Sequence, residues 1–553
     1  MPRFVKIPLV RKVPAKAWAL ALLSAGLQIL VFPKPSLFFL CWVAMVPLIY
    51  GLLRGRGGEG ELVDPEGRSL RPFTLRQGFL IAWVSGVVWY VGTCYWIYPV
   101  MNGYGGLSAL EATLITAGYC LIMAMHHGAF GLLLVLMARR SSLGNRRPLL
   151  LAPFFWVAIE FVRDRVIGVP WQPLGGAQVD NIPFARISET TGVYGLSFAV
   201  MLVNCAFTAA LLLYGRRRVN LLVAAAAATI ALQMGVFAKP GPFATNKEAV
   251  LVQANVPVLR QWTAPYFEQT LAALSALSIE SVGKRGQSDP GLIVWPESPA
   301  PFALLAEPYP GQPEANFQRW LTATAREANS FMVVGSTAEV ANANQEGHPA
   351  IFNSALVVDP TGRAIGRYDK IHLVPFGEYV PFQSWLFFAS KLTREVGDFA
   401  RGTKREPFDL NGLKAGVFIC YESIFPNEVR QFTANGAQVL INISDDAWYG
   451  ETGAPFQHLQ MARMRAIENH RWILLATNNG VTASIDPYGR IIKSVDRNIR
   501  TALTAPFAPQ TEVTFYSRFG DKFAWLCVVI SLIAVFVRLH LRGRTMIEAP
   551  SAP

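Results

Sequence analysis

The chain of 553 residues is 52% hydrophobic and only 16% charged, and its mean hydropathy is +0.30. Soluble globular proteins carry about 25% charged residues, so the composition excludes an ordinary soluble protein and indicates that part of the chain lies in a membrane. The net charge of +13 does not indicate a nucleic-acid partner, because most arginines cluster at the ends of apolar segments.

Eight apolar segments are close to the roughly 20 residues that a helix needs to cross a bilayer. Seven lie before residue 240 and one lies near the C-terminus: 17–32, 36–53, 77–98, 108–138, 148–162, 193–214, 219–238 and 523–540. The first follows a basic stretch, as in a signal peptide, but no small-residue cleavage pattern follows it clearly. We therefore expect the first segment to be retained as a helix.

The distribution of basic residues predicts how these segments are oriented in the membrane. Arginine and lysine are frequent before residue 17, in the second, fourth and sixth connections, and in the C-terminal tail. The alternate connections are poorer, with none in 99–107 and three in 163–192. Because cytoplasmic loops carry an excess of these residues, we expect both termini in the cytoplasm and residues from about 240 to 522 outside it.

The predicted organisation has three parts. Residues 1–238 form a transmembrane bundle of about seven helices, residues 247–510 form an α/β domain, and residues 523–540 form a C-terminal transmembrane helix. In the α/β domain, short β-branched runs alternate with helical stretches, which indicates a layered fold. The expected strands are 249–253, 291–295, 331–335, 355–358, 364–368, 415–420, 438–443, 473–477, 483–485 and 491–495, and the expected helices include 315–328 and 458–467.

Polar residues with catalytic chemistry follow several of these strands. Cys420 ends the run 415–420 and is the single cysteine outside the apolar segments. A lone thiol is a candidate nucleophile, although free cysteine is also commonly buried and inert. A thiol is mostly protonated at neutral pH, so its attack on an acyl carbonyl needs a base and a donor for the oxyanion. Glu297 and Lys370, which follow two other strand-like runs, supply these groups.

These segments resemble the nitrilase, or carbon–nitrogen hydrolase, superfamily, in which a Glu–Lys–Cys triad lies in an α-β-β-α sandwich. The three motifs fall on Glu297, Lys370 and Cys420 in that order. Over nearly its full length the chain resembles more closely the bacterial apolipoprotein N-acyltransferase family, which joins a multi-span bundle to a nitrilase-like catalytic domain and a last helix. The matching runs are 168–171, 295–297, 370–378, 419–422, 446–448, 460–466 and 477–482.

The resemblance implies a two-stage acyl transfer that needs no metal or other cofactor. Cys420 would take an acyl chain from a phospholipid, expected to be phosphatidylethanolamine, as a thioester, and the amine of a diacylglyceryl-cysteine apolipoprotein would accept it. Glu297 would be the base and Lys370 would hold the oxyanion. The family also implies supporting or substrate-contacting roles for Glu378, Tyr421, Glu422, Trp262, Asn353 and Trp448. The enzyme would act as a monomer in the bacterial inner membrane, with its catalytic domain in the periplasm.

Other interpretations of the acidic and basic residues are open from the sequence alone. Glu297 is also consistent with a helix cap at a strand end, and Lys370 with a solvated surface charge. Glu378 and Glu422 are equally consistent with ion pairs or hydrogen bonds that only support the fold. The carboxylates therefore have a structural as well as a catalytic interpretation.

Histidines and tryptophans near these motifs have two interpretations each. His372 and His458 lack the paired spacing of metal ligands, so packing or polar support is favoured over a metal site. Trp262 and Trp448 are either core aromatics or contacts for an acyl chain, and the sequence does not distinguish these.

Two rival functions explain part of the sequence. A membrane-anchored amide or nitrile hydrolase would use the same triad with water as acceptor, but one anchor would suffice and seven preceding spans would be unexplained. A transporter with a large outer domain usually has charged or broken helices at mid-membrane, whereas these apolar segments contain few ionisable residues.

Overall fold

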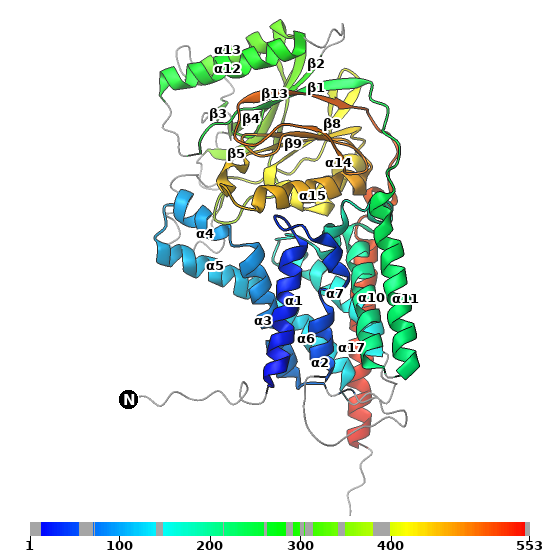
Figure 1. Cartoon of the computed structure of the whole chain (residues 1–553). Helices are drawn as coiled ribbons and strands as arrows, with labels where there is room; N and C mark the ends of the chain where they lie inside the picture. The colour runs from blue at the N-terminus through cyan, green and yellow to red at the C-terminus, as the bar shows by residue number, and fades with distance from the viewer. Residues whose placement is uncertain are drawn as a thin grey trace, which may run out of the picture. The chain divides into compact units, whose positions relative to one another are not determined.

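The computed structural model describes residues 13–54, 70, 72–139, 147–213, 215–258, 263–283, 291–298, 303–304, 313–340, 349–379 and 399–547. The chain divides into two units. The first comprises Met1–Tyr95, Leu114–Lys239 and Asp521–Pro553, and the second comprises Trp96–Thr113 and Pro240–Gly520. The first is helical and the second is built mainly on two sheets (Figure 1).

Each of the eight apolar segments expected from the sequence contains a helix. The long helices are α1 (Ala15–Val31), α2 (Val46–Arg54), α3 (Leu75–Thr93), α5 (Ala109–Met123), α6 (Met125–Ala138), α7 (Arg147–Val166), α10 (Val193–Leu212), α11 (Gly215–Gln233) and α17 (Lys522–Ile547). Glycines allow α3 and α6 to pack closely, because a Cβ at Gly131 would lie 2.5 Å from the carbonyl oxygen of Gly78. Such small residues are typical of helix interfaces inside membranes.

Within the described part of the chain, four helices are long and apolar enough to span a membrane by length and composition: Ala109–Ala138, Val193–Leu212, Gly215–Phe237 and Lys522–His540. The helices Leu75–Thr93 and Ile97–Tyr104, bent by 57°, form a fifth candidate if they are one span. Pro99 follows the bend and has no N–H to donate to the carbonyl four residues earlier. The eight crossings therefore stay a prediction. Four or five of them have the length and composition of a membrane span in the described residues.

Two sheets form the centre of the second unit. The first has the order β13-β1-β2-β4-β5-β6, with β3 beside β4, and the second has the order β12-β11-β10-β9-β8-β7. The first-sheet strands are β1 (Lys247–Gln253), β2 (Gly291–Val294), β3 (Ala303–Leu304), β4 (Ser330–Val340), β5 (Ala350–Val358), β6 (Ala364–Asp369) and β13 (Thr501–Phe507). The second-sheet strands are β7 (Phe408–Leu410), β8 (Leu413–Ile419), β9 (Val439–Ser444), β10 (Ile473–Thr477), β11 (Ala483–Ile485) and β12 (Ile491–Ser494).

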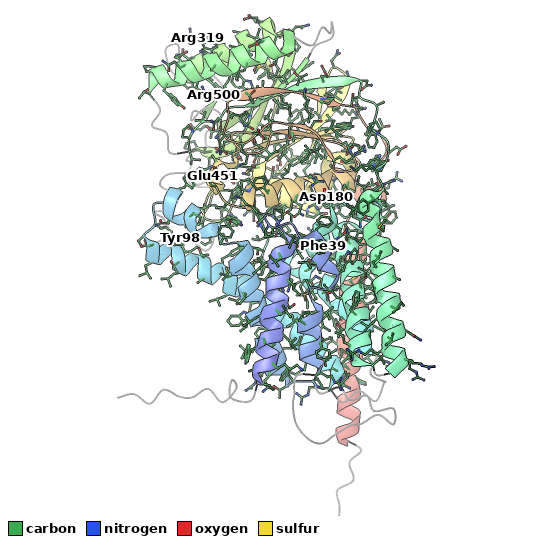
Figure 2. All side chains as sticks on the ribbon, viewed as in Figure 1. Phe39, Tyr98, Asp180, Arg319, Glu451 and Arg500 are labelled. Atoms are coloured by element: carbon green, nitrogen blue, oxygen red, sulfur yellow. The ribbon has the colours of Figure 1, made fainter. Side chains whose placement is uncertain are left out.

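Pairs of helices cover the outer faces of these sheets (Figure 1). On the first sheet lie α12 (Ala264–Gly283) and α13 (Pro313–Glu327), and on the second lie α14 (Pro426–Ala434) and α15 (Ala454–Asn469). Leu274 of α12 and Phe317 of α13 pack into one core cluster with Trp295 at the end of β2. Arg319, elsewhere on α13, is exposed (Figure 2). The helix–sheet–sheet–helix layering agrees with the fold expected for the catalytic domain.

Replacing Leu274 with alanine should destabilise the second unit by about 2–5 kcal/mol, because a fully buried leucine leaves a cavity when truncated. We expect a lower unfolding temperature for the full-length protein in detergent, measured by circular dichroism. Gln269→Ala is the matched control, since Gln269 is exposed on the same helix. Equal unfolding temperatures for the two variants would contradict the packing of α12 on the sheet.

Candidate active site

Cys420 lies at a sharp turn between a strand and a short helix. The strand β8 ends at Ile419, one residue earlier than expected, and Cys420 begins the 3-10 helix η7 (Cys420–Ile424). The φ angle of Cys420 is +50°, a left-handed conformation that costs a non-glycine residue about 1–3 kcal/mol. Strained strand-to-helix turns of this kind present nucleophiles in other enzymes.

Lys370 is a buried ammonium held between two carboxylates. Its Nζ atom donates to Oε1 of Glu297 at 3.2 Å and to Oε1 of Glu378 at 2.8 Å, and the side chain is 1% exposed. Asn353 on β5 donates its Nδ2 to the same two oxygens, at 2.7 Å and 2.6 Å. Burial alone would lower the pKa of Lys370, but the two carboxylates raise it well above its usual value. The lysine is therefore a fixed positive charge.

Backbone contacts fix the orientation of the two carboxylates. Oε2 of Glu297 accepts a hydrogen bond from the backbone N–H of Asp445 at 2.9 Å, and Oε2 of Glu378 accepts one from Val374 at 2.8 Å. Gly335 on β4 makes room for the segment that carries Glu297, since a Cβ there would lie 2.3 Å from the Pro296 carbonyl oxygen. Both carboxylates thus use one oxygen for the lysine and the other for the main chain.

The thiol of Cys420 is buried and interacts with this charge cluster. Burial raises the pKa of Cys420 well above its usual value, the Glu297 carboxylate adds to the rise, and the Lys370 ammonium opposes it. The resting group is therefore the neutral thiol. A base must remove its proton before it can attack a carbonyl, and Glu297 is the carboxylate with the strongest influence on it.

Glu422 joins the turn that carries the thiol to the segment that carries the lysine. Its carboxylate accepts hydrogen bonds from the Tyr368 hydroxyl at 2.8 Å and 2.9 Å, from the backbone N–H groups of Ile371 and His372 at 2.7 Å and 3.0 Å, and from that of Ile419 at 2.8 Å. Burial raises the pKa of Glu422 to about 6, against the backbone hydrogen bonds, which lower it. The side chain is fully buried and bonds to both segments.

The remaining predicted positions lie in different surroundings. Tyr421 is buried beside the thiol in the chain and packs edge-on against Phe425, with ring centroids 5.3 Å apart. Trp448 is half-buried and packs edge-on against Tyr104, with ring centroids 5.9 Å apart. Trp262 lies outside the described residues.

Residues directly after β9 lie beside these groups; the sequence matched the run 446–448 to the family but gave no role to Asp445 or Asp446. Besides the N–H of Asp445, the Asp446 carboxylate accepts from Ser444 Oγ at 2.8 Å and lies 3.0 Å from Nδ1 of His458. Their position directly after a strand could have indicated them. Strands β8 and β9 are parallel neighbours, so the residues that follow them lie at the same edge of the sheet. Among the described residues, no group of three or more histidine, cysteine or acidic side chains is arranged to hold a metal ion.

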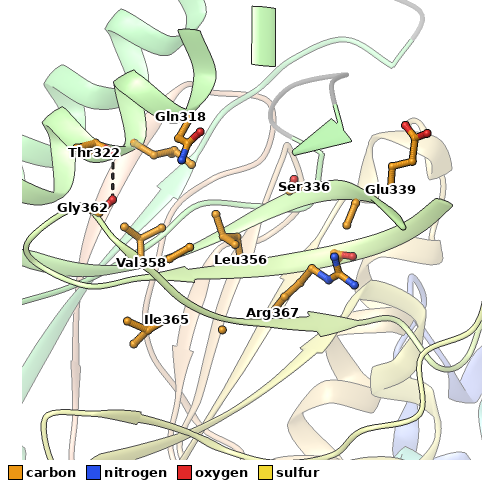
Figure 3. A pocket seen from close by; sticks show the side chains of 14 residues that line it. Gln318, Thr322, Ser336, Glu339, Leu356, Val358, Gly362, Ile365 and Arg367 are labelled. Carbon is orange, nitrogen blue, oxygen red and sulfur yellow. Dashed lines mark hydrogen bonds between the residues drawn. The ribbon is translucent and has the colours of Figure 1, made fainter. Parts of the chain in front are cut away.

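A separate groove of about 440 Å³ lies on the first sheet, between its outer face and α13 (Figure 3). It is lined by Gln318, Thr322, Glu339, Leu356 and Arg367, among others. None of the predicted site residues lines it. The groove is therefore distinct from the buried cluster around Lys370.

Two family models match the chain. The apolipoprotein N-acyltransferase N-terminal domain matches residues 24–206, and the carbon–nitrogen hydrolase domain matches residues 249–513. The second match covers both sheets and the cluster of Glu297, Lys370 and Cys420.

Three bacterial proteins named apolipoprotein N-acyltransferase are similar over most of the chain. That of Geobacter metallireducens is 33% identical over 553 residues, covering 98% of this chain and 99% of its own. That of Pseudomonas putida is 32% identical over 479 residues, covering 84% and 88%, and that of Haemophilus ducreyi is 31% identical over 483 residues, covering 85% and 89%. With identity at this level along its whole length, the chain belongs to the apolipoprotein N-acyltransferase family.

Proposed function

We propose that this protein transfers a fatty acyl chain from a phospholipid, through a thioester on Cys420, to the N-terminal amine of diacylglyceryl-cysteine in apolipoproteins. The observation that supports this most directly is the buried cluster in which Glu297 and Lys370 interact with the Cys420 thiol. The family favours an acyltransferase over the transporter considered from the sequence. The apolar helices suit an enzyme whose donor and acceptor are both held in a membrane.

In the first stage, Glu297 takes the thiol proton as Cys420 attacks the ester carbonyl of the phospholipid. The negative charge that forms on the carbonyl oxygen is stabilised by the Lys370 ammonium, which is already in place and needs no reorganisation. When the C–O bond breaks, Glu297 returns the proton to the leaving alkoxide. The products are a lysophospholipid and a thioester on Cys420. Phosphatidylethanolamine is our expected donor.

In the second stage, the neutral α-amine of the apolipoprotein attacks the thioester carbonyl. Glu297 accepts the proton that the amine loses, Lys370 again holds the oxyanion, and the C–S bond breaks to give an amide. The thiolate of Cys420 takes the proton back from Glu297, which restores the resting state. Water must be excluded between the stages, because hydrolysis of the thioester would make the enzyme a phospholipase.

Glu378, Glu422 and Asn353 act on this chemistry through the groups they hold. Glu378 and Asn353 balance and orient the ammonium and the base. Glu422 fixes the distance between the thiol turn and the lysine segment. We assign Tyr421, Trp448 and Trp262 to contacts with the acyl chain or its entrance. All the proposed catalytic groups belong to one chain, so a monomer suffices.

Incubation of the purified enzyme with phosphatidylethanolamine should add one fatty acyl mass to the peptide that contains Cys420, detected by mass spectrometry. Cys420→Ala should show no adduct and no transfer, while Cys205→Ala, which removes another buried cysteine, should retain both. Adding a diacylglyceryl-cysteine peptide should convert the adduct into an N-acyl peptide. Release of free fatty acid at the same rate with and without the peptide would instead support the hydrolase alternative.

Glu297→Gln should slow thioester formation by about 10²–10⁴-fold, because the amide has no basic oxygen for the thiol proton. The rate is measured by quenching single-turnover reactions with labelled phospholipid. Glu327→Gln serves as the control, since Glu327 is exposed on α13. Thioester formation by Glu297→Gln within about twofold of the unmodified enzyme would eliminate this residue as the base.

The proposed topology places the catalytic domain in the periplasm and both termini in the cytoplasm, on the distribution of basic residues. In a Cys420→Ala background, Thr361→Cys lies in an exposed turn between β5 and β6 and should react with a membrane-impermeant maleimide in intact spheroplasts. Arg218→Cys, exposed at the start of α11, should react only after permeabilisation. The opposite pattern would reverse the orientation.

A further inference from the structure

A buried histidine contacts the backbone of the residue that carries the thiol. His458 lies on α15, its side chain is 1% exposed, and its Nε2 atom is 3.0 Å from the carbonyl oxygen of Cys420 and 2.7 Å from Ser423 Oγ. Its Nδ1 atom is 3.0 Å from Oδ1 of Asp446. The imidazole therefore connects the turn after β8 with the turn after β9.

The partners of the two ring nitrogens determine where the protons lie. A carbonyl oxygen can only accept a hydrogen bond, so the 3.0 Å contact with Cys420 assigns a proton to Nε2, and the Ser423 hydroxyl, 2.7 Å away, accepts from the same N–H. Oδ1 of Asp446 already accepts the hydroxyl of Ser444 at 2.8 Å, and as a carboxylate oxygen it also accepts from Nδ1. Both nitrogens of His458 then carry a proton, so that the ring is an imidazolium paired with an aspartate.

The charges around the ring support this assignment. Burial alone would lower the pKa of His458, but the Asp446 carboxylate raises it above its usual value, with further contributions from the Cys420 carbonyl and Glu297. The ring of Tyr449 lies beside the imidazole, tilted by 58° with ring centroids 6.2 Å apart. Gly480 leaves room for the aspartate, since a Cβ there would lie 2.3 Å from Oδ2 of Asp446.

The contact with the carbonyl determines the direction of the next backbone N–H. A trans peptide is planar, so its C=O and N–H bonds point in opposite directions. With the Cys420 carbonyl directed at His458, the N–H of Tyr421 is turned away from α15. An imidazolium also polarises the peptide group and strengthens its N–H as a donor.

We infer that His458, held by Asp446, is a positioning residue that orients the Cys420–Tyr421 peptide so that its N–H faces the oxyanion formed on the acylated thiol. The inference rests on the proposed function and extends it. Lys370 supplies the charge for the oxyanion, and the oriented peptide supplies a second donor. The same contact holds Cys420 in its strained backbone conformation, with φ of +50°.

The test compares two substitutions in the full-length enzyme in detergent. His458→Gln keeps an N–H at the position of Nε2 and loses the contact with Asp446, whereas His458→Phe keeps the ring volume and loses both hydrogen bonds. We expect the single-turnover rate of thioester formation to fall by about 10-fold for glutamine and by about 10²–10³-fold for phenylalanine, the effect of losing an oxyanion donor. The KM for phospholipid should change little, because the donor acts mainly in the transition state.

Alkylation of Cys420 by iodoacetamide separates positioning from general damage. This reaction displaces iodide and forms no oxyanion, so both variants should be alkylated within about threefold of the unmodified rate. Gln460→Ala, on the same helix and half-buried, is the control and should keep both rates. If His458→Phe does not fold, Asp446→Asn replaces it, since this change removes the charge that holds the imidazolium.

Three results would overturn the inference. The first is acylation by both His458 variants at the unmodified rate. The second is equal loss of acylation and alkylation, which would mean that the histidine merely maintains the fold. The third is equal loss of acylation by His458→Gln and His458→Phe, because no rescue by the remaining N–H would then exist. Failure of the unmodified enzyme to form a thioester, with normal alkylation, would instead contradict the proposed function.

Discussion

The buried ammonium of Lys370 is the interaction on which the rest of the site depends. A charge out of contact with water is stable only if oppositely charged and hydrogen-bonding groups surround it. Two carboxylates meet this need, and each is in turn fixed by Asn353 and by a backbone N–H. These partners come from the ends of β2, β6 and β9 and from within β5, so the surroundings of one lysine bring together groups from both sheets.

The sequence predicted where most strands of the second unit lie along the chain, but not their order within the two sheets. Alternating β-branched runs located most strands, and the family motifs located Glu297, Lys370 and Cys420. The seven-residue strand β13 was not predicted, because Pro506 weakens the strand signal although an edge strand tolerates a proline. The hydrogen bond from the Asp445 backbone N–H to Glu297 was also not predicted, since main-chain contacts depend on tertiary structure and not on residue type.

The helical part illustrates a different limit. Hydropathy located the long apolar helices but not the short helices between residues 174 and 191, because apolar composition is a local signal that needs a long run. The number of membrane crossings is harder to predict from the sequence. Helix α1 and the segment Phe38–Arg54 each have only 17 residues. Helix α7 carries the polar residues Glu160, Arg163 and Asp164 at buried positions. Those polar side chains form hydrogen bonds with one another and with neighbouring segments. These hydrogen bonds offset the free-energy cost of burying the charges, and they cannot be predicted from the sequence.

The site draws its groups from both sheets of the domain. Glu297, Asn353 and Lys370 follow or lie in strands of the first sheet, whereas Cys420 follows a strand of the second. Neither sheet by itself carries the proposed nucleophile together with its proposed base. Under the proposed function, a chain with only one sheet formed would therefore be unable to cleave a phospholipid ester. Reactivity toward lipids would then require that the two layers have docked.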